Sequence, residues 1–544
     1  MKKMSFVAAL LACAATLISL AQAQNTTRQP DESMRIQPTG TYALKPAVER
    51  TPEQMDAFEA TFVAPIEMEE PRPRPTIDPV LYEQLKHEAN IQPRGIKPGG
   101  GGGANFSVNP LTAKVDTKFA GASYCDEDFD SECWNPPDVG GAIGKSQFVS
   151  VSNDEVEVRS RTGALTKINS LNGFFGYSTE AIYDPRVQWD PEWQRWIITC
   201  LGFPEGTTGA NGTAVHQYLF IGISQTSSAT GAWWIYSLDV NFFGGTGSLY
   251  DFDMLGMTQD ALIFTGNIFG ANAFLGSNLF SVAKARLYGG FAYGFEYWKG
   301  LEATLQPADQ MLTDQNGYAW LAAITGNNIY MYAMGSPANP NQTSLSGPFT
   351  VSGVSAFTAP PNAAQPSACA GSATLDTDDG RFEQVGIQNG DTYYQVHAEG
   401  LAGYTSNRYY VITGLLSFAP TVSVSNYVYA SSTSEDWNPS IAADPNGDFA
   451  INWSSDDPDG GLLPSEHYVD NSAGNPVDAP GIAVYTSASC YNTGSPFRWG
   501  DYSSITLDYG SGTRAVNTTK LFWVDNETTP NLNVWSTEVG KVAY

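Results

Sequence analysis

A sequence pattern that recurs along most of the chain limits the folds open to it. Residues 184–191 (DPRVQWDP) align with residues 438–445 (NPSIAADP). In the same way, residues 251–258 (DFDMLGMT) align with residues 501–508 (DYSSITLD). The copies stand about 45 to 70 residues apart, which is enough for a small sheet of four strands. The pattern therefore predicts one β unit that is repeated around a common centre.

Looser copies extend the repeat. One begins at Asp138, one spans residues 381–388, and a further copy near residues 307–320 would fill the one double-length gap. Between the copies, short apolar runs alternate with turn sequences, as at residues 217–224, 233–240, 261–267 and 409–416. Strong turn signals occur at residues 389–391 and 445–447. We predict an all-β fold, a single β-propeller of about seven four-stranded blades. A pair of β-sandwiches is the alternative, but it leaves the recurring pattern unexplained.

The first residues have the order of an export signal. Lys2 and Lys3 precede an apolar stretch over about residues 6–20, and Ala21-Gln22-Ala23 ends it as a small-x-small cleavage site. We therefore predict a signal peptide over residues 1–23 and a secreted or periplasmic product. No later stretch approaches the roughly 20 apolar residues that a membrane helix needs, so we expect no membrane insertion.

Composition excludes some classes of protein. The formal net charge is −28, which disfavours binding to nucleic acid or anionic lipid and favours a soluble monomer. Aromatic residues make up 12% of the chain and charged residues 15%, unlike a disordered protein. We expect a large core in which most of the aromatic side chains pack between blades.

Residues 24–105 differ in composition from the rest of the chain. They are rich in Pro, Gln, Arg and Glu and end in five glycines, Gly99 to Gly103. Two stretches have helical character, residues 52–64 and 78–90, but neither has enough partners for a core of its own. We predict a flexible low-complexity segment, a spacer or a pro-segment, with the propeller over residues 106–544. A small helical domain is the alternative.

Five cysteines lie beyond the predicted signal peptide. Cys125 and Cys133 are close in sequence, and in an oxidising compartment we expect them to form a disulfide. Cys200, Cys369 and Cys490 allow one further disulfide and leave one thiol over. The sequence does not decide which two of these three pair.

A site is expected where the innermost strands of a propeller begin, because their leading residues line the central funnel. The candidates for an anionic ligand are Arg186, Arg381, Arg498, Asp138, Asp184, Asp251 and Asp501. Arginines on separate blades would hold a carboxylate or sulfate by forked, charge-assisted hydrogen bonds. Neighbouring aspartates would act as acid or base. The alternative is that each arginine pairs with a local aspartate and only fixes the loop before its strand.

One acidic loop has a spacing typical of calcium ligands. Asp126, Asp128 and Asp130 stand at alternate positions between Cys125 and Cys133. The loop lacks the glycine of a complete calcium loop, so a solvated acidic loop is the alternative. Calcium is the one cofactor that the sequence offers.

Several of these segments together resemble a family. Residues 136–144 (PPDVGGAIG), 184–186 (DPR), 379–381 (DGR) and 498–502 (RWGDY) are similar to those of bacterial secreted sialidase-like propeller proteins, most of them uncharacterised. The resemblance covers most of residues 106–544 and implies a neuraminidase-type propeller. The chain has no Arg-Ile-Pro sequence, and residues 444–447 match an Asp-box only in part.

These observations support three hypotheses for the function. The first is a binding or interaction module for a glycan or a protein, without chemistry of its own. The second is a sialidase-like glycoside hydrolase that uses the funnel arginines and an aspartate. The third is a calcium-stabilised surface or matrix protein.

Overall fold

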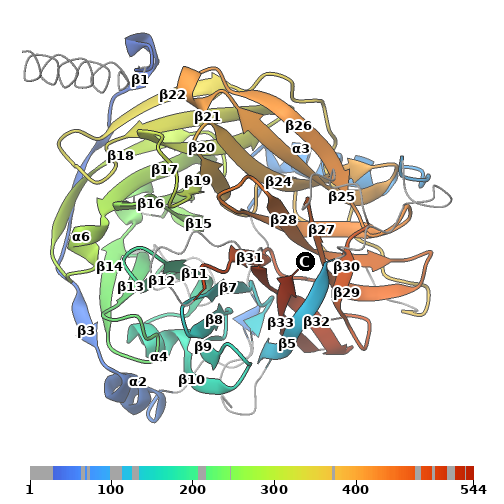
Figure 1. Cartoon of the computed structure of the whole chain (residues 1–544), viewed down its shortest axis with the longest axis horizontal. Coiled ribbons are helices and arrows are strands. Elements are labelled where there is room, and N and C mark those ends of the chain that lie inside the picture. The colour runs from blue at the N-terminus through green and yellow to red at the C-terminus, as the bar shows by residue number, and fades with distance from the viewer. Residues whose placement is uncertain are drawn as a thin grey trace, which may run out of the picture.

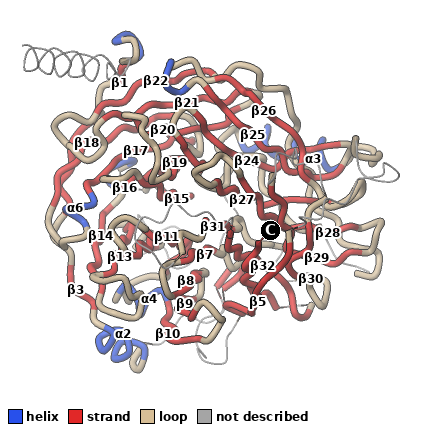
Figure 2. Tube along the Cα trace, viewed as in Figure 1, coloured by secondary structure: helices blue, strands red, loops and turns tan. Residues whose placement is uncertain are grey.

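The structure, a computed structural model, describes residues 29–62, 68–69, 74–98, 113–124, 134–205, 216–245, 247–271, 273–369, 374–471, 480–492, 497–510, 521–532 and 534–543. In these ranges the chain forms a ring of β-sheets around a central axis (Figure 1). The helices are short and lie mostly at the periphery of the ring (Figure 2). No helix among the described residues is long and apolar enough to cross a membrane. The predicted all-β propeller is confirmed.

The sheets consist of consecutive strands that pair antiparallel. The first group is β7 (Gly140–Ile143), β8 (Gln147–Val151), β9 (Glu155–Ser160) and β10 (Leu165–Ser170). The second is β11 (Ile182–Asp190), β12 (Arg195–Gly202), β13 (Tyr218–Ser224) and β14 (Trp233–Asp239). The third is β15 (Leu249–Met257), β16 (Ala261–Phe269), β17 (Phe274–Ala283) and β18 (Tyr293–Leu301). The fourth is β19 (Gln306–Gln310), β20 (Tyr318–Thr325), β21 (Asn328–Gly335) and β22 (Ser344–Thr350).

The remaining groups complete the ring. They are β23 (Gly386–Asn389), β24 (Thr392–Leu401), β25 (Tyr404–Thr413) and β26 (Thr421–Val428), then β27 (Glu435–Ala443), β28 (Phe449–Asp457), β29 (Leu462–Asp470) and β30 (Ile482–Thr486). The last contains β31 (Ser504–Leu507), β32 (Leu521–Asn531), β33 (Val534–Ala543) and the early strand β5 (Lys114–Ser123). Pairing of β5 with β33 ties the start of the ring to its end and covers an edge that would otherwise be open. The number of blades, about seven from the sequence, stays a prediction.

The recurring sequence pattern corresponds to the innermost strands. Asp184 in β11 and Asn438 in β27 both have a left-handed backbone, with φ of 52° and 47°. The strand register shifts at both places, so each residue lies in a bulge. Aspartate and asparagine tolerate this conformation better than other side chains, which explains why they recur there. The copy expected near residue 307 is β19, an innermost strand that pairs with β15 and β23.

Part of the predicted flexible segment packs against the ring. The strands β1 (Arg35–Ile36), β2 (Gly40–Leu44) and β3 (Val48–Arg50) extend three sheets at their outer edges by pairing with β22, β18 and β14. The two predicted helical stretches are present as α2 (Pro52–Glu59) and α3 (Pro79–Asn90). Thr51 and Asp78 cap their N-termini. The five glycines lie outside the described residues.

Smaller elements complete the fold. The strand β4 (Met68–Glu69) pairs in parallel with β6 (Trp134–Asn135). The remaining helices are α4 (Leu171–Phe175), α5 (Asn241–Gly244), α6 (Lys284–Leu287), η1 (Glu32–Met34) and η2 (Leu415–Ser417).

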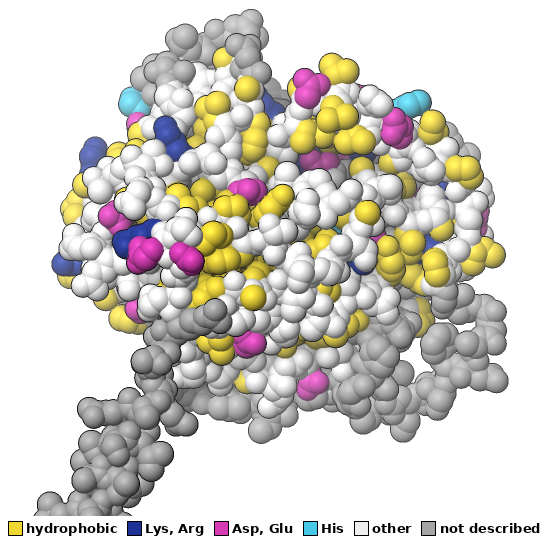
Figure 3. Space-filling view, turned by 90° about the horizontal axis from the view of Figure 1, so that it is seen from above, with side chains coloured by type: hydrophobic (Ala, Val, Ile, Leu, Met, Phe, Trp, Pro, Cys, Tyr) yellow, Lys and Arg dark blue, Asp and Glu magenta, His cyan; other side chains and the backbone are white. Residues whose placement is uncertain are grey.

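Aromatic side chains fill the space between the sheets, as expected. The largest fully buried side chains are nine tryptophans: Trp196, Trp233, Trp298, Trp320, Trp437, Trp453, Trp499, Trp523 and Trp535. Many acidic side chains are buried as well, for example Glu157, Glu466 and Asp525. The acidic surplus is thus not confined to the surface. Acidic and basic side chains are scattered across the face in Figure 3, with hydrophobic side chains between them.

One disulfide joins Cys369, between β22 and β23, to Cys490, after β30. Cys200 is a buried free thiol. The Cys369–Cys490 bond is one of the pairings that the sequence left open. Cys125 and Cys133 lie outside the described residues.

Candidate functional site

The candidate funnel residues gather at one end of the axis, where the innermost strands begin. Each is at most 8% exposed, and the set is Asp138, Asp184, Arg186, Asp251, Arg381, Arg498 and Asp501. The backbone N–H of Asp501 donates to Asp138 Oδ1 at 2.6 Å, so the first and last parts of the ring meet here. Tyr502, the next residue, donates its hydroxyl to Asp184 Oδ2 at 3.4 Å.

Two of the three arginines pair within their own segment. Arg381 forms a forked pair with Asp379, at 2.8 Å from Nε and 2.7 Å from Nη2, and lies 3.0 Å from Asp378. Arg498 lies 3.1 Å from Asp501. These pairs are what the alternative interpretation, local fixing of a loop, expects.

The third arginine has a different environment. The guanidinium of Arg186 lies over the ring of Tyr502, with 3.4 Å from Cζ to the ring centroid. Its Nε donates to the backbone carbonyl of Asp253 at 3.0 Å. The three arginines therefore share one region but are not arranged as a common fork around an open space.

Burial governs the protonation of the carboxyl groups in this region. It raises the pKa of Asp501 and of Asp184 well above the usual value, and the charge of Asp138 raises both further. Burial also raises the pKa of Asp378 to about 7. For Asp379, burial acts in the same direction, but the charge and hydrogen bonds of Arg381 outweigh it and hold the pKa below the usual value. Neutral and charged carboxyls thus stand side by side.

The start of the helix α3 and the residues just before it lie against this cluster. Arg74, Tyr82, Asp378 and Asp501 are among the residues that line a cavity of about 220 Å³ beneath it. Lys86 of α3 is 7% exposed and donates from Nζ to the backbone carbonyls of Pro360 and Asp378. The sequence did not point to this contact, although residues 78–90 were recognised as helical.

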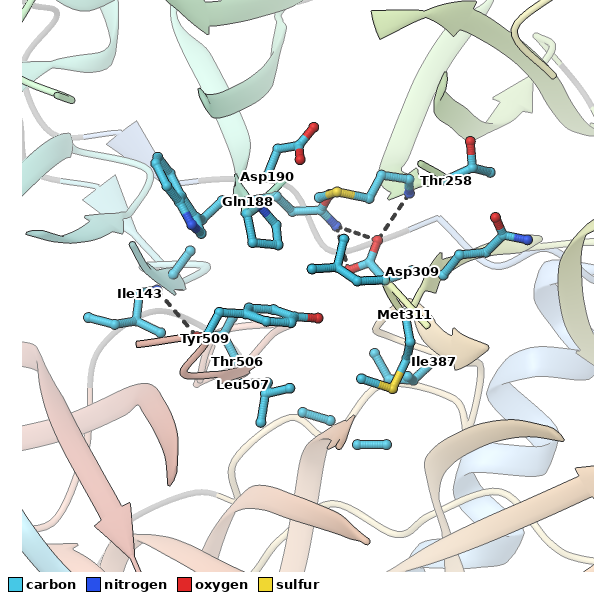
Figure 4. Close-up of a pocket in the computed structure, with 18 of the residues that line it drawn as sticks. Ile143, Gln188, Asp190, Thr258, Asp309, Met311, Ile387, Thr506, Leu507 and Tyr509 are labelled. Atoms are coloured by element: carbon cyan, nitrogen blue, oxygen red, sulfur yellow. Dashed lines mark hydrogen bonds between the residues drawn. The ribbon is translucent and has the colours of Figure 1, made fainter. Parts of the chain in front are cut away.

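A second pocket lies at the opposite end of the axis, where the innermost strands finish (Figure 4). It has a volume of about 100 Å³. Its lining comes from every innermost strand and includes Ile143, Gln188, Met257, Asp309, Ile387, Ala443 and Leu507. Trp189, Gln259, Gln310 and Tyr509 add aromatic and amide groups.

Asp309 is the central polar group of this pocket. Gln188 Nε2 donates to both of its carboxyl oxygens at 3.0 Å, and the backbone N–H of Met257 donates to Oδ1 at 3.0 Å. Burial raises its pKa to about 7, while these hydrogen bonds act in the opposite direction. Lys284 lies near it and pairs with Asp190 at 2.7 Å. The Tyr509 hydroxyl points across the pocket toward Asp309 (Figure 4).

The recurring sequence pattern includes residues that line this pocket, but it did not lead to the prediction of a site there. Gln188 belongs to the copy at residues 184–191 that supplied Asp184 and Arg186. The prediction considered only the leading residues of each copy, whereas the pocket is formed by the trailing ones.

The calcium hypothesis remains a prediction. Asp126, Asp128 and Asp130 lie outside the described residues. Among the residues that the structure does describe, no group of three or more His, Cys, Asp or Glu side chains is arranged to hold a metal ion. A second acidic stretch, residues 456–460 (DDPDG), forms a turn. The Asp457 carboxylate accepts hydrogen bonds from the Thr433 hydroxyl and from the backbone N–H of Gly460, so it stabilises this loop.

The fold and these sites define a β-propeller with a covered cluster of acids and arginines at one end and a pocket at the other. No family model and no curated protein matches the chain. Among solved structures, it is similar to a protein of unknown function from Dyadobacter fermentans, at 10% identity and a TM-score of 0.34, over 66% of this chain and 93% of that one.

Two other solved structures illustrate the range of similarity. An α-L-arabinanase of Penicillium chrysogenum is 9% identical with a TM-score of 0.32, over 74% of this chain and 92% of that one. A subtype N10 neuraminidase-like protein of a bat influenza A virus is 8% identical with a TM-score of 0.32, over 63% of this chain and 96% of that one. Identities and TM-scores this low support no statement about function.

Proposed function

We propose that this chain is an extracytoplasmic β-propeller that binds a glycan at the Asp309 pocket without transforming it. The predicted export signal at residues 1–23 and the Cys369–Cys490 disulfide support an oxidising compartment. The main support is the contrast between the two ends of the axis. At the arginine end, Arg381 and Arg498 pair with local aspartates, whereas the other end presents a pocket with amide, carboxyl and aromatic groups.

The chemistry of the pocket fits a sugar ring. Carbohydrate hydroxyls need closely placed hydrogen-bond partners, and the side-chain oxygens of Gln259, Gln310 and Asp309 supply acceptors. The side-chain N–H groups of both glutamines donate to backbone carbonyls of the protein. The faces of a sugar ring carry C–H groups, for which Trp189 and Tyr509 offer aromatic surface.

Titration with neutral oligosaccharides tests the proposal. Wild type and Tyr509→Ala are titrated calorimetrically with di- to tetrasaccharides of galactose, glucose, xylose and arabinose, and released reducing sugar is measured in parallel. We expect saturable binding to wild type, at least about tenfold weaker binding to Tyr509→Ala, and no release of sugar. The matched control is Tyr330→Ala, on the outer part of its sheet. No binding to wild type, or equal binding to all three proteins, would contradict the proposal.

A sialidase-like hydrolase is the second candidate, and the arginine end favours it. There Asp378, with a pKa of about 7, and Asp379, with a lowered pKa, flank Arg381 as an acid and a charged carboxylate. The role of the arginines in binding an anionic sugar belongs to this candidate, and it requires α3 to move away. Release of sialic acid from 3′-sialyllactose by wild type, and its loss in Asp378→Asn, would favour it over the binding module.

A further inference from the structure

The amide donors of the Asp309 pocket are turned toward the protein itself. Gln188 Nε2 donates to a backbone carbonyl at 2.7 Å as well as to the carboxyl of Asp309. Gln259 Nε2 donates to two backbone carbonyls, at 3.3 and 3.2 Å. Gln310 Nε2 donates to a third, at 2.9 Å. These hydrogen bonds fix which end of each amide is left for a ligand.

The pocket therefore offers acceptors in excess of donors. No described residue donates a hydrogen bond to Oε1 of Gln259 or of Gln310. The carboxyl of Asp309 is a further acceptor, and it is half-buried rather than sealed off. A ligand that only donates fits such a lining better than one that must also accept.

The charges that line the pocket are also unbalanced. Lys284 is the only basic side chain among the described residues of the lining, and it pairs with Asp190 at 2.7 Å. Tyr288 donates to the same carboxylate at 2.7 Å. Asp309 forms no ion pair with a described residue. Burial raises its pKa to about 7, because ionisation without a counter-charge is costly there.

An ammonium group supplies what this lining lacks. It carries one positive charge and three donors and has no acceptor. The aromatic rings of Trp189 and Tyr509 also line the pocket, and the face of an aromatic ring attracts a cation. The Tyr509 hydroxyl points toward Asp309, so this ring borders the space in front of the carboxyl (Figure 4). A carboxylate or sulfate group would instead be repelled by Asp309.

We propose that the Asp309 pocket selects a sugar unit with a free amino group, such as glucosamine, and holds its ammonium against the Asp309 carboxylate. This inference rests on the glycan-binding function proposed above and narrows the ligand to amino sugars. N-acetylation removes the charge and two of the donors, so an acetylated unit should bind much more weakly.

Three disaccharides with the same backbone test the selection. Chitobiose in its free-amine form, N,N′-diacetylchitobiose and cellobiose differ only in the group at C2 of each ring. Each is titrated calorimetrically into the wild-type full chain at pH 7. We expect chitobiose to bind at least about tenfold more tightly than either of the others, because its hydrogen bonds to Asp309 are charge-assisted.

Proton release provides a second readout in wild type. At pH 6 the Asp309 carboxyl is mostly protonated, and a bound ammonium should ionise it, so at least about half a proton per chitobiose should be released. Calorimetry in two buffers with different ionisation enthalpies measures this number. Asp190 and Lys284 remain paired with each other, and burial raises the pKa of Tyr393 and Tyr509, so neither tyrosine titrates near pH 6. N,N′-diacetylchitobiose should release no proton.

A variant then connects the selection to the carboxyl. Asp309→Asn keeps the shape of the side chain and should reduce the preference for chitobiose over N,N′-diacetylchitobiose to less than about threefold. It should also abolish the proton release. Glu32→Gln, at an exposed position, is the control and should leave both unchanged.

The possible failures are distinct. Equal affinity of wild type for chitobiose and N,N′-diacetylchitobiose would overturn the selection of an ammonium and leave the glycan-binding function standing. Binding of the diamine putrescine as tight as that of chitobiose would overturn the role of the sugar. If none of the three disaccharides binds, both this inference and the glycan-binding function are wrong.

Discussion

The guanidinium of Arg186 lies over the ring of Tyr502, with 3.4 Å between Cζ and the ring centroid. Arg186 belongs to β11 and Tyr502 lies two residues before β31, so this contact joins two sheets that are far apart in the sequence. Both residues are buried, and a cation–π contact removed from water is stronger than one at the surface.

The Arg186–Tyr502 contact predicts a difference between two substitutions. Tyr502→Leu removes the ring and should lower the free energy of unfolding by about 2 kcal/mol or more. Tyr502→Phe keeps the ring and loses only a long hydrogen bond, so it should cost less than about 1 kcal/mol. Urea unfolding monitored by tryptophan fluorescence measures both, and equal losses would show that the ring is not what holds Arg186.

Stability should fall as the pH rises from about 4 to about 7. Burial raises the pKa of Asp184, Asp251 and Asp501, and raises that of Asp309 to about 7. In this window the folded state holds more protons than the unfolded state, so deprotonation favours unfolding. His467, with a pKa lowered to about 4 by burial, acts in the opposite direction but is outnumbered. The thermal midpoint should therefore be higher at pH 5 than at pH 8.

The contribution of Asp309 to this pH dependence can be measured separately from that of the other carboxyl groups. Asp309→Asn removes its titration at nearly constant volume and should reduce the difference in thermal midpoint between pH 5 and pH 8. Glu32→Gln, at an exposed position, is the control and should leave the difference unchanged. A midpoint that rises from pH 5 to pH 8 in wild type would contradict the pKa assignments.

The disulfide should contribute strongly to stability. Cys369 and Cys490 are 121 residues apart, so their bond restricts the unfolded chain over a long loop. Replacing both by alanine should lower the free energy of unfolding by about 2–5 kcal/mol. Denaturant unfolding of the double variant measures this, with Cys200→Ser as a control for the loss of a thiol. A loss no larger than that of the control would show that the bond is dispensable.

Gly403→Ala should weaken the attachment of residues 74–98 to the propeller, because Gly403 closely approaches Pro93. Its Cβ would strike the Pro93 carbonyl, in addition to the cost of a positive φ. Gly390→Ala is the matched control, because its φ is +62° and a Cβ there meets nothing within 4 Å. Protease cleavage within residues 74–98 should become faster in Gly403→Ala than in Gly390→Ala. Equal rates would show that the close approach does not matter.

The repeat and its local signals were readable from the sequence. Residues 217–224, 233–240 and 261–267 form β13, β14 and β16 nearly as predicted, because alternation and turn residues act locally. The run predicted at residues 409–416 belongs to β25, which begins earlier, at Tyr404, and ends at Thr413. The left-handed positions of Asp184 and Asn438 explain why the recurring pattern begins with such residues.

The packing of the N-terminal segment against the propeller could not be predicted from the sequence. The strands β1, β2 and β3 join outer edges through backbone hydrogen bonds, which place few demands on side chains. Residues 74–98 are attached through ion pairs of Lys86, Arg94 and Lys97, which in the sequence look like ordinary charged residues. Their partners lie more than 270 residues away along the chain, so no local pattern connects them.

Hydrogen exchange of the full chain, with and without the neutral oligosaccharide mixture, tests the account most directly. We predict slower exchange of backbone amides around Gln188, Gln259 and Tyr509, with unchanged exchange in residues 376–381 and 74–98 and no sugar released. Protection of residues 376–381, accompanied by faster exchange in residues 74–98 and release of reducing sugar, would contradict the account. That result would identify the arginine end as an active site.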